Sequence, residues 1–298
     1  MNVIETQELR RTFGSKDAVR SLDLRVPAGS VCALLGPNGA GKTTTIKMLM
    51  NLIRPSGGQA RVLGVDSRRL GAVEKARIGY VSENHEMPEW MTVRAFLDYC
   101  REFYPTWDRE LEAKLLTRFA LPEERSLKHL SRGMKMKAAL LAALAYRPEL
   151  LVLDEPFSGL DPAVREDFVR GLFEATGDGE WSILVSSHDI DEVERFVDWI
   201  AFIDDGRLVI SESLESLQAR FRRVEVTLAD QMMIRAEELP PAWRDLQQSG
   251  KLVRFIDTAH MEADGGRLYA ERFPGAAMTA GPLSLRDIYL TVARMTRV

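Results

Sequence analysis

A glycine-rich segment, GPNGAG, occupies positions 36–41 and is followed directly by Lys42 and Thr43. This arrangement fits the pattern GxxxxGK[ST], in which glycines let consecutive backbone N–H groups curl around a phosphate. The Lys42 ammonium would reach the β and γ oxygens of a nucleotide, and the Thr43 hydroxyl would ligate Mg²⁺. A glycine-rich turn before an ordinary helix is the alternative. The expected phosphate-binding residues are Gly36, Pro37, Asn38, Gly39, Ala40, Gly41, Lys42, Thr43 and Thr44.

A pair of carboxylates, Asp154 and Glu155, follows an apolar run at positions 150–153. Asp154 at the end of such a strand is placed to hold Mg²⁺, while Glu155 can orient or deprotonate an attacking water. The alternative is an exposed acidic strand end. The nearby phosphate loop favours the chemical interpretation, because a nucleotide-bound Mg²⁺ needs oxygen ligands.

A second helix start suited to an anion is expected at Ser131, a good N-cap residue. The helix behind it is predicted from Arg132 to about Tyr146, where an Arg-Pro pair ends it. A phosphate at this start would meet the Ser131 hydroxyl, the Gly133 amide and the positive end of the helix dipole. A well-capped core helix is the alternative.

Short apolar runs that alternate with longer helical patterns must position these residues. Such alternation predicts βα units on a mostly parallel sheet that is buried on both faces, within an α/β fold. The predicted strand–helix pairs are 31–35 with a helix from Lys42, 150–153 with 163–175, and 183–185 with 190–197. Two alternating segments, 3–9 and 22–26, predict antiparallel strands at an edge.

The remaining chain is expected to hold a helical insertion and a small C-terminal α+β unit. The insertion spans about 86–147, with helices predicted at 93–103 and 110–119. A domain boundary is predicted between residues 219 and 220, which gives a core domain 1–219 and an accessory domain 220–298. In the C-terminal part we expect a helix at 214–223, strands at 224–228, 252–256 and 267–273, and a last helix at 285–295 capped by Ser284.

Composition excludes several classes of protein. The 298 residues carry 40 Lys and Arg against 44 Asp and Glu, so the formal charge of −4 gives no global basic field for nucleic acid. The longest apolar run has nine residues, at 138–146, whereas a membrane-spanning helix needs roughly 20. We therefore expect any membrane role to come through a partner. Two cysteines and a polar first twenty residues favour a reducing compartment and argue against secretion.

The sequence LSRGM at 130–134, ahead of Asp154, completes a set that resembles the ABC ATPases, the nucleotide-binding subunits of ATP-binding-cassette transporters. The resemblance runs in order through at least residues 3–218. It implies that Phe13 stacks on adenine, that Glu83 stands where the family usually has a glutamine that touches Mg²⁺ and water, and that His188 contacts the γ-phosphate. It also implies nucleotide contacts by Ser131, Gly133, Met134 and Asp161. Taken alone, Phe13 could be a core residue, Glu83 a solvated acid and His188 a helix cap.

The sequence departs from the family pattern at three positions. The commonest signature is LSGGQ, whereas here Arg132 replaces a glycine and Met134 replaces the glutamine. Glu83 places an acid where an amide is usual, although carboxylate oxygen can still ligate Mg²⁺. Ser131, Gly133 and Glu155 are retained, so a competent site is expected.

The resemblance implies an ATP-hydrolysing subunit that closes head to tail on a second cassette and moves a membrane permease at the cytoplasmic face. A tail segment, LSLRDIYL at 283–290, resembles that of cassettes serving ABC-2 type exporters. An amphipathic helix that finishes a small domain is the alternative for this segment. Two other functions stay open: a soluble ABC ATPase acting on nucleic acid or the ribosome, and a kinase that uses the phosphate loop on a small acceptor. We expect no nucleic-acid partner, because one cassette is present and residues 43–130 hold no sustained heptads.

Overall fold

The computed structural model describes residues 1–83, 86–176, 181–262 and 265–295. The chain divides into two compact units, Met1–Ser211 and Glu212–Val298. Each unit buries a hydrophobic core of its own.

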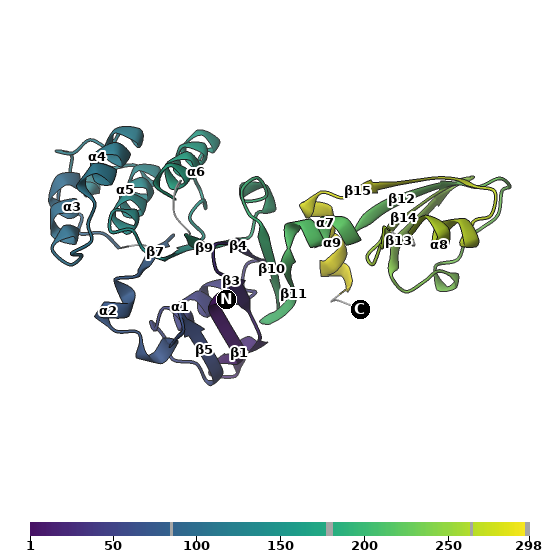
Figure 1. Cartoon of the computed structure of the whole chain (residues 1–298), viewed down its shortest axis with the longest axis horizontal. Coiled ribbons are helices and arrows are strands. Elements are labelled where there is room, and N and C mark those ends of the chain that lie inside the picture. The colour runs from purple at the N-terminus through teal and green to yellow at the C-terminus, as the bar shows by residue number, and fades with distance from the viewer. Residues whose placement is uncertain (84–85, 177–180, 263–264, 296–298) are drawn as a thin grey trace. The chain divides into compact units, whose positions relative to one another are not determined.

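A six-stranded sheet is the centre of the first unit (Figure 1). Its strand order is β11-β10-β4-β9-β8-β7, and the pairs β10–β4, β4–β9, β9–β8 and β8–β7 are parallel. Every residue of β8 and β9 is buried, as expected for a parallel sheet covered on both faces. The predicted α/β fold with a mostly parallel sheet is confirmed. The strands are β4 (Val31–Leu35), β7 (Ile78–Ser82), β8 (Leu150–Asp154), β9 (Ser182–Ser187), β10 (Trp199–Asp204) and β11 (Arg207–Ser213).

The first unit also holds a second, antiparallel sheet. Its strands come partly before and partly after the phosphate loop in the sequence. The predicted single strand at 22–26 is wrong, because β2 ends at Leu22 and β3 begins at Arg25. The Thr6 hydroxyl explains the break: it donates to the Leu22 carbonyl at 2.6 Å and accepts the Leu24 amide at 2.7 Å. The strands of this sheet are β1 (Asn2–Phe13), β2 (Lys16–Leu22), β3 (Arg25–Pro27), β5 (Gly57–Val62) and β6 (Val65–Asp66).

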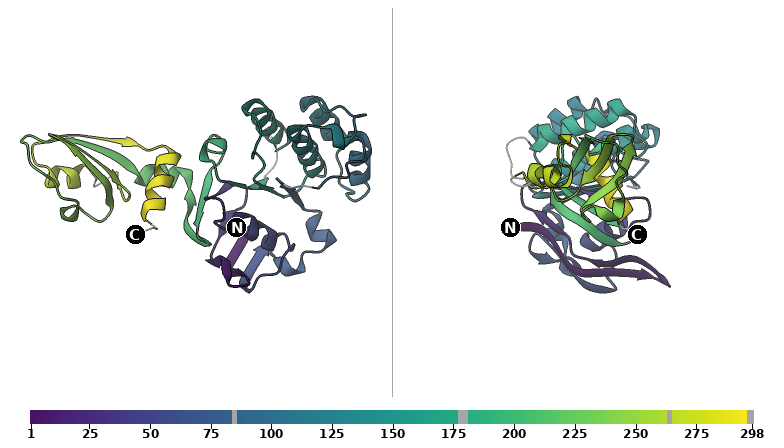
Figure 2. Two further views of the ribbon diagram at one scale, coloured as in Figure 1. Left: turned by 180° about the vertical axis from the view of Figure 1, so that it is seen from behind. Right: turned by 90° about the vertical axis from the view of Figure 1, so that its right-hand side faces the viewer.

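Helices that follow the strands complete the first unit. The helices α3 to α6 gather in one group, visible from both sides (Figures 1 and 2), with contacts of α4 and α5 to α6 and of α3 to α5. Side-chain oxygens of Thr92, Asp108 and Ser131 cap α3, α4 and α5. The helices are α1 (Lys42–Leu49), α2 (Ala72–Lys75), α3 (Val93–Arg101), α4 (Arg109–Arg118), α5 (Arg132–Leu144) and α6 (Pro162–Thr176), with 3₁₀ turns at Ser67–Arg69 and Leu127–His129.

The helix predicted at 190–197 is wrong. The chain forms a 3₁₀ turn at Ile190–Glu192, capped by Asp189, and further turns up to β10. Three apolar residues of this segment are buried: Ile190, Val193 and Val197. Their spacing is typical of one face of a helix, but consecutive tight turns can bury residues at the same spacing.

The second unit packs an antiparallel sheet of order β13-β14-β12-β15 with helices. Trp243, Phe255, Tyr269 and Phe273 are prominent in its core. The strand predicted at 267–273 is wrong: it is the helix α8, on which Tyr269 is buried and Leu268 is exposed. The last helix was predicted correctly, and the Ser284 hydroxyl accepts the Asp287 amide at 3.1 Å. The elements are α7 (Leu214–Arg220), β12 (Arg222–Thr227), a 3₁₀ turn at Ala236–Glu238, β13 (Trp243–Ser249), β14 (Leu252–Asp257), α8 (Gly265–Arg272), β15 (Ala277–Pro282) and α9 (Leu285–Met295).

Candidate nucleotide-binding site

The carboxyl ends of four parallel strands meet at one edge of the six-stranded sheet. The register pairs Leu35 of β4 with Ser187 of β9, and Asp154 of β8 with Ser186 of β9 and Ser82 of β7. Gly36, Glu83, Glu155 and His188 each follow one of these strand ends directly. Residues far apart in the sequence therefore converge where open α/β sheets bind their ligands.

The phosphate loop connects β4 to α1 by a path that requires glycine at two points. A Cβ atom at Gly36 would lie 2.2 Å from the Ile203 carbonyl oxygen. At Gly41, φ is +104°, and a Cβ atom would lie 2.5 Å from the Ala18 carbonyl oxygen. A side chain at either position would move the loop away from the strands that hold it.

Lys42 is the buried cation of the loop, with only 5% of its surface exposed. Its Nζ donates to the carbonyl oxygens of Gly36 at 2.7 Å and Pro37 at 3.2 Å. It also forms an ion pair with Glu155 Oε1 at 3.0 Å. The catalytic base proposed from the sequence is thus in contact with the phosphate-loop lysine.

Asp154 is bound by two hydroxyl groups, one of them from the residue that follows Lys42. The hydroxyls of Thr43 and Ser186 donate to Asp154 Oδ1 at 3.0 and 2.8 Å. Burial raises the pKa of the Asp154 carboxyl and nearby Glu155 raises it further, while the two hydrogen bonds act against this shift. Ser186 was not among the residues predicted from the sequence, and its hydroxyl also accepts the Glu155 amide at 3.0 Å. Its position at the end of an apolar strand, two residues before His188, was the signal that the sequence offered.

Glu155 and His188 form the next contact outward. The two side chains approach within 2.8 Å, between His188 Nδ1 and Glu155 Oε2. Glu155 has a φ of +52°, which is uncommon for a residue with a side chain. Such backbone strain clusters at functional sites, where the surrounding structure enforces it.

Glu83 lies at the entrance to the helical segment and accepts two hydrogen bonds at the same oxygen. Arg132 Nη2 and the Ser158 hydroxyl donate to Glu83 Oε1 at 2.7 and 2.8 Å. Burial opposes the shift, but these two bonds lower the pKa of the Glu83 carboxyl below its ordinary value.

These contacts surround a pocket of about 480 Å³. Phe13 stands on its wall with 46% of its surface exposed, and the Arg11 guanidinium lies 4.4 Å from the ring centre. Lys16, Ala18 and Ser158 also line the pocket, although no binding role was predicted for them from the sequence. The predicted residues on the wall are Phe13, Asn38, Gly39, Gly41, Lys42, Thr43, Thr44, Glu83, Glu155 and His188.

Four of the predicted nucleotide contacts lie outside that wall as the structure describes it: Ser131, Gly133, Met134 and Asp161. Ser131 caps α5, with its hydroxyl accepting the Met134 amide at 3.2 Å. Gly133 packs against α6, where a Cβ atom would lie 2.7 Å from Val164 Cγ1. Asp161 accepts the Val164 amide at 2.9 Å and so caps α6. The chain thus presents a capped helix start apart from its own phosphate loop.

The donor set beside the phosphate loop suits Mg²⁺. Thr43 Oγ1 and Asp154 Oδ1, 3.0 Å apart, are hard oxygen donors of the kind that magnesium prefers. In the described part of the chain, no group of three or more His, Cys, Asp or Glu residues could hold a metal. Magnesium usually takes one or two protein oxygens and completes its shell with phosphate and water, which fits these two donors.

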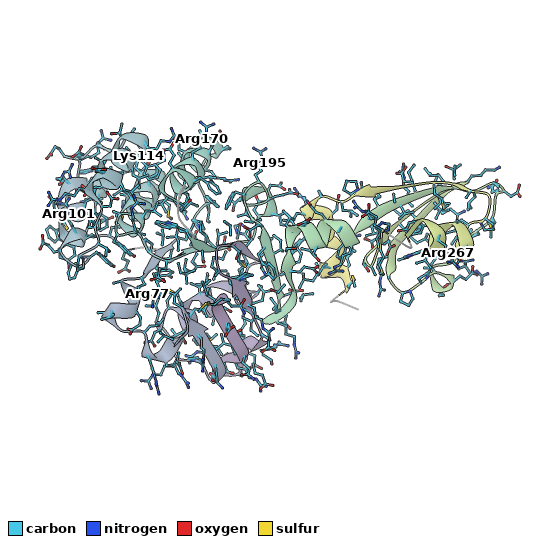
Figure 3. All side chains as sticks on the ribbon, in the orientation of Figure 1. Arg77, Arg101, Lys114, Arg170, Arg195 and Arg267 are labelled. Carbon is cyan, nitrogen blue, oxygen red and sulfur yellow. The ribbon has the colours of Figure 1, made fainter. Side chains whose placement is uncertain are left out.

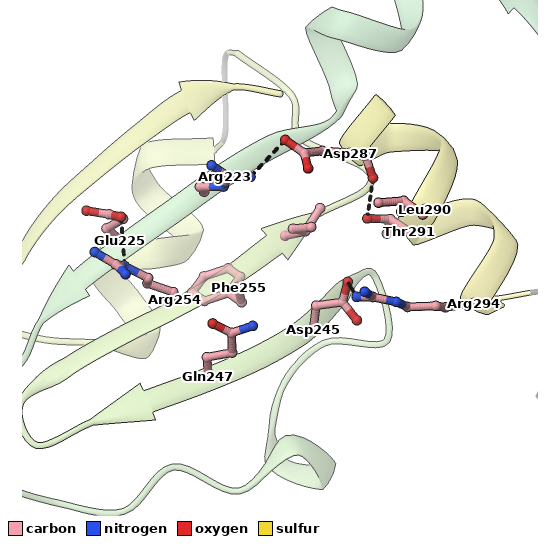
Figure 4. Close-up of a pocket in the computed structure, with 11 residues that line it drawn as sticks. Arg223, Glu225, Asp245, Gln247, Arg254, Phe255, Asp287, Leu290, Thr291 and Arg294 are labelled. Atoms are coloured by element: carbon pink, nitrogen blue, oxygen red, sulfur yellow. Dashed lines mark hydrogen bonds and ion pairs between the residues drawn. The ribbon is translucent and has the colours of Figure 1, made fainter. Parts of the chain in front are cut away.

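A second pocket, in the C-terminal unit, has a different character (Figure 4). Three arginines line it, and each is paired with a carboxylate: Arg223 with Asp287 at 3.0 Å, Arg254 with Glu225 at 2.8 Å, and Arg294 with Asp245 at 2.6 Å. These pairings neutralise the arginines, and the pocket offers no glycine loop to a phosphate.

No helix in the described ranges is both long enough and apolar enough to cross a bilayer.

Comparison with known proteins places the chain in a family. Residues 19–158 match the family model described as ABC transporter. The daunorubicin/doxorubicin resistance ATP-binding protein DrrA of Streptomyces peucetius is 38% identical over 72% of this chain and 67% of its own length. The bacitracin transport ATP-binding protein BcrA of Bacillus licheniformis is 32% identical over 77% of this chain and 76% of its own. A solved structure described as the ATP binding subunit of an ABC transporter is 28% identical, with a TM-score of 0.66 over 72% of this chain and 92% of that one. With its phosphate loop and buried Lys42 in the same fold, the chain belongs to the ABC transporter family, as an ATP-binding subunit.

Proposed function

We propose that this ABC ATPase binds MgATP in the pocket between its phosphate loop and Glu155, and that hydrolysis there drives a membrane permease, an exporter. The observation that carries the proposal is the continuous contact Lys42–Glu155–His188 at the pocket, with Thr43 and Asp154 beneath it. It joins a cation that can hold phosphate oxygens, a carboxylate that can take a proton from water and a histidine that can orient that carboxylate, and such groups serve phosphoryl transfer to water.

In this proposal, Lys42 exchanges its present partners for the β and γ oxygens of ATP. The exchange frees Glu155 Oε1, which lies 3.0 Å from Lys42 Nζ, to accept a proton from water. The oxygen of that water attacks the γ-phosphorus, the bond to the β-phosphate oxygen breaks, and ADP leaves with the bonding electrons. Glu155 holds the proton, and His188 at 2.8 Å from Glu155 Oε2 orients the base and contacts the γ-phosphate.

The supporting residues have separate tasks. Thr43 and Asp154 would hold Mg²⁺, which supplies charge neutralisation on the phosphates when bound. Glu83 would contact the same ion or its water through its carboxylate, and Phe13 would stack on the adenine ring. Arg11 supports this use of Phe13, because its guanidinium lies 4.4 Å from the ring centre and leaves one face for a base.

Hydrolysis is proposed to need two cassettes that face each other head to tail. The capped start of α5, with Ser131, Gly133 and Met134, lies outside the wall of its own chain's pocket as described. A γ-phosphate held by the phosphate loop of one chain and the α5 start of the other would be stabilised from two sides. Asp161 would contribute from the loop that leads into α6.

Two kinds of observation support the proposal of a permease partner and of export: the descriptions of the relatives, and two features of this chain. DrrA is described as a resistance protein and BcrA as a transport protein. The tail helix resembles that of cassettes for ABC-2 type exporters. Exposed aromatic side chains at Trp90, Tyr99 and Phe103 offer a docking surface on the helical segment 86–147. Docking there would hold the subunit at the cytoplasmic face of the membrane. In this proposal residues 1–219 form the cassette, and residues 220–298 form an accessory domain.

The test of the site is Lys42→Ala, measured by ATP binding and phosphate release. We expect the variant to lose most ATP affinity, because Lys42 is the buried cation that meets the phosphates. The matched control is Lys114→Ala, which removes an exposed lysine of α4 (labelled in Figure 3). Unchanged affinity in a folded Lys42→Ala protein would contradict the assignment of the site.

A further inference from the structure

Two of the positions at which this chain departs from the family pattern are in contact with each other. Arg132, where the signature usually has glycine, donates from Nη2 to Oε1 of Glu83 at 2.7 Å. Glu83 itself stands where a glutamine is usual. The departures therefore form one ion pair between the strand end of β7 and the start of α5.

The position of Arg132 is fixed from two directions. Its Nη2 is bound to Glu83, and its guanidinium lies over Gly159, where a Cβ atom would be 3.0 Å from Nη1. Gly159 has a φ of +67°, and neighbouring Ser158 donates to the same Glu83 oxygen at 2.8 Å. The side chains of Arg132 and Glu83 remain 49% and 33% exposed, so solvent reaches the pair.

An acid at position 83 changes the electrostatics of the pocket. Glu83 and Glu155 both line it, with Asp154 beneath, while Lys42 is the buried cation beside them. ATP brings several negative charges to this place, and a further carboxylate repels them.

We propose that Arg132 is a positioning residue that offsets the charge of Glu83 and holds its carboxylate in place, so that a pocket with an acid at this position can admit ATP. The proposal rests on the proposed nucleotide site and deepens it. It makes the two departures one unit: Glu83 is compatible with nucleotide binding because Arg132 neutralises it. A glutamine at 83 would not need an arginine at 132.

The experiment is a double-mutant cycle read by equilibrium binding of ATP and ADP, with EDTA and separately with excess Mg²⁺. Arg132→Met should weaken binding of metal-free ATP by about three- to fivefold, as for loss of a partly exposed charge partner. The effect should be smaller with Mg²⁺, because free ATP carries more negative charge than its magnesium complex. In the Glu83→Gln background, Arg132→Met should change the affinity by less than about twofold. Arg132→Lys should retain most of the affinity, and Arg132→Gln should behave like Arg132→Met.

A matched control removes a paired arginine elsewhere. Arg77→Met breaks the ion pair of Arg77 with Glu149, outside the pocket wall (Arg77 is labelled in Figure 3), and should leave ATP affinity unchanged. The proposal is wrong if Arg132→Met and Arg132→Gln leave the affinity unchanged. It is also wrong if Arg132→Met lowers the ATP affinity by the same factor whether position 83 holds Glu or Gln. A purely structural role of Arg132 would give that result. Failure of the proposed site is distinct, since Lys42→Ala would then bind ATP as wild type does.

Discussion

Asp154 illustrates how a single residue is held for chemistry at a cost in stability. Its carboxyl group is buried, and its Oδ1 accepts hydrogen bonds from Thr43 and Ser186. Burial raises its pKa, and nearby Glu155 adds to the shift. An ionised carboxylate in this environment is therefore a local strain on the nucleotide-free fold, which a bound cation would relieve.

The first prediction concerns the pH dependence of stability. A raised folded-state pKa means that the folded protein binds the Asp154 proton more tightly than the unfolded chain does. The free energy of unfolding should fall as pH rises from the ordinary value of 3.8 through the folded-state pKa, and stay lowered at neutral pH. Asp154→Asn should remove this loss and raise the melting temperature of the nucleotide-free protein at pH 7, while Mg²⁺-dependent ATP binding falls.

The measurement compares melting temperatures at pH 7 with and without MgATP. Asp230→Asn, at an exposed position, serves as the control and should have no effect. A lower melting temperature for nucleotide-free Asp154→Asn would contradict the interpretation of Asp154 as a strained carboxylate.

At the scale of the element, the helical segment 86–147 exposes a tryptophan next to a residue that hydrogen bonds within the same segment hold in place. Trp90 precedes α3 and is 79% exposed. The adjacent Glu89 is bound to Lys135 of α5 at 2.8 Å, and its carbonyl accepts the Ser126 hydroxyl at 2.7 Å. An exposed tryptophan on a backbone fixed in this way is suited to bind a partner. Because Lys135 has this partner within the chain, the anion contact proposed at the α5 start would fall to Ser131 and Gly133.

The second prediction is that a cysteine introduced at Trp90 crosslinks to the membrane subunit in the assembled transporter. The native cysteines are Cys32, which is buried, and Cys100, which should be replaced by serine in the background. A cysteine at Met233, 83% exposed in the C-terminal unit, is the matched control and should not crosslink. Crosslinks from position 233 alone would assign docking to the C-terminal unit.

At the scale of the whole molecule, the chain offers one phosphate loop and a separate capped helix start in the same cassette. The proposed closed state needs a second cassette to join them, and ATP must bind that state more tightly than the open one. A variant that binds ATP without hydrolysing it should therefore accumulate as a dimer.

The third prediction uses Glu155→Gln, which retains size and hydrogen bonding but removes the basic carboxylate. Hydrolysis should fall by about 10²- to 10⁴-fold, the usual contribution of a general base. MgATP should convert the variant to dimers in light scattering after size exclusion, and ADP should not. Full hydrolysis by strictly monomeric wild-type chains would rule out the head-to-tail arrangement.

The fourth prediction concerns the two compact units. A chain that ends at Ser211 retains the phosphate loop, Asp154, Glu155 and His188 with their core. It should fold and bind ATP with an affinity within about threefold of that of the full chain, since every residue that lines the pocket as described belongs to the first unit. Calorimetric titration with ATP measures this. A folded, truncated chain that cannot bind ATP would assign part of the site to residues 212–298.

The sequence by itself determined the features that depend on neighbours along the chain. The phosphate loop, the strands β4 and β8, the cap at Ser131 and the last helix follow from local patterns, because glycine spacing, apolar runs and capping residues act within a few positions. Periodicity alone failed at 190–197 and 267–273, where one apolar spacing fits more than one conformation.

Only the tertiary structure decided which of these residues meet. Ser186 acquires its role from the register of β8 with β9, which places it opposite Asp154. The Glu83–Arg132 pair likewise joins positions 49 residues apart in the sequence. Such contacts depend on how strands and helices that are far apart in the sequence pack together. The shared hydrophobic core sets this packing, so the spacing of two residues in the sequence does not reveal whether they meet.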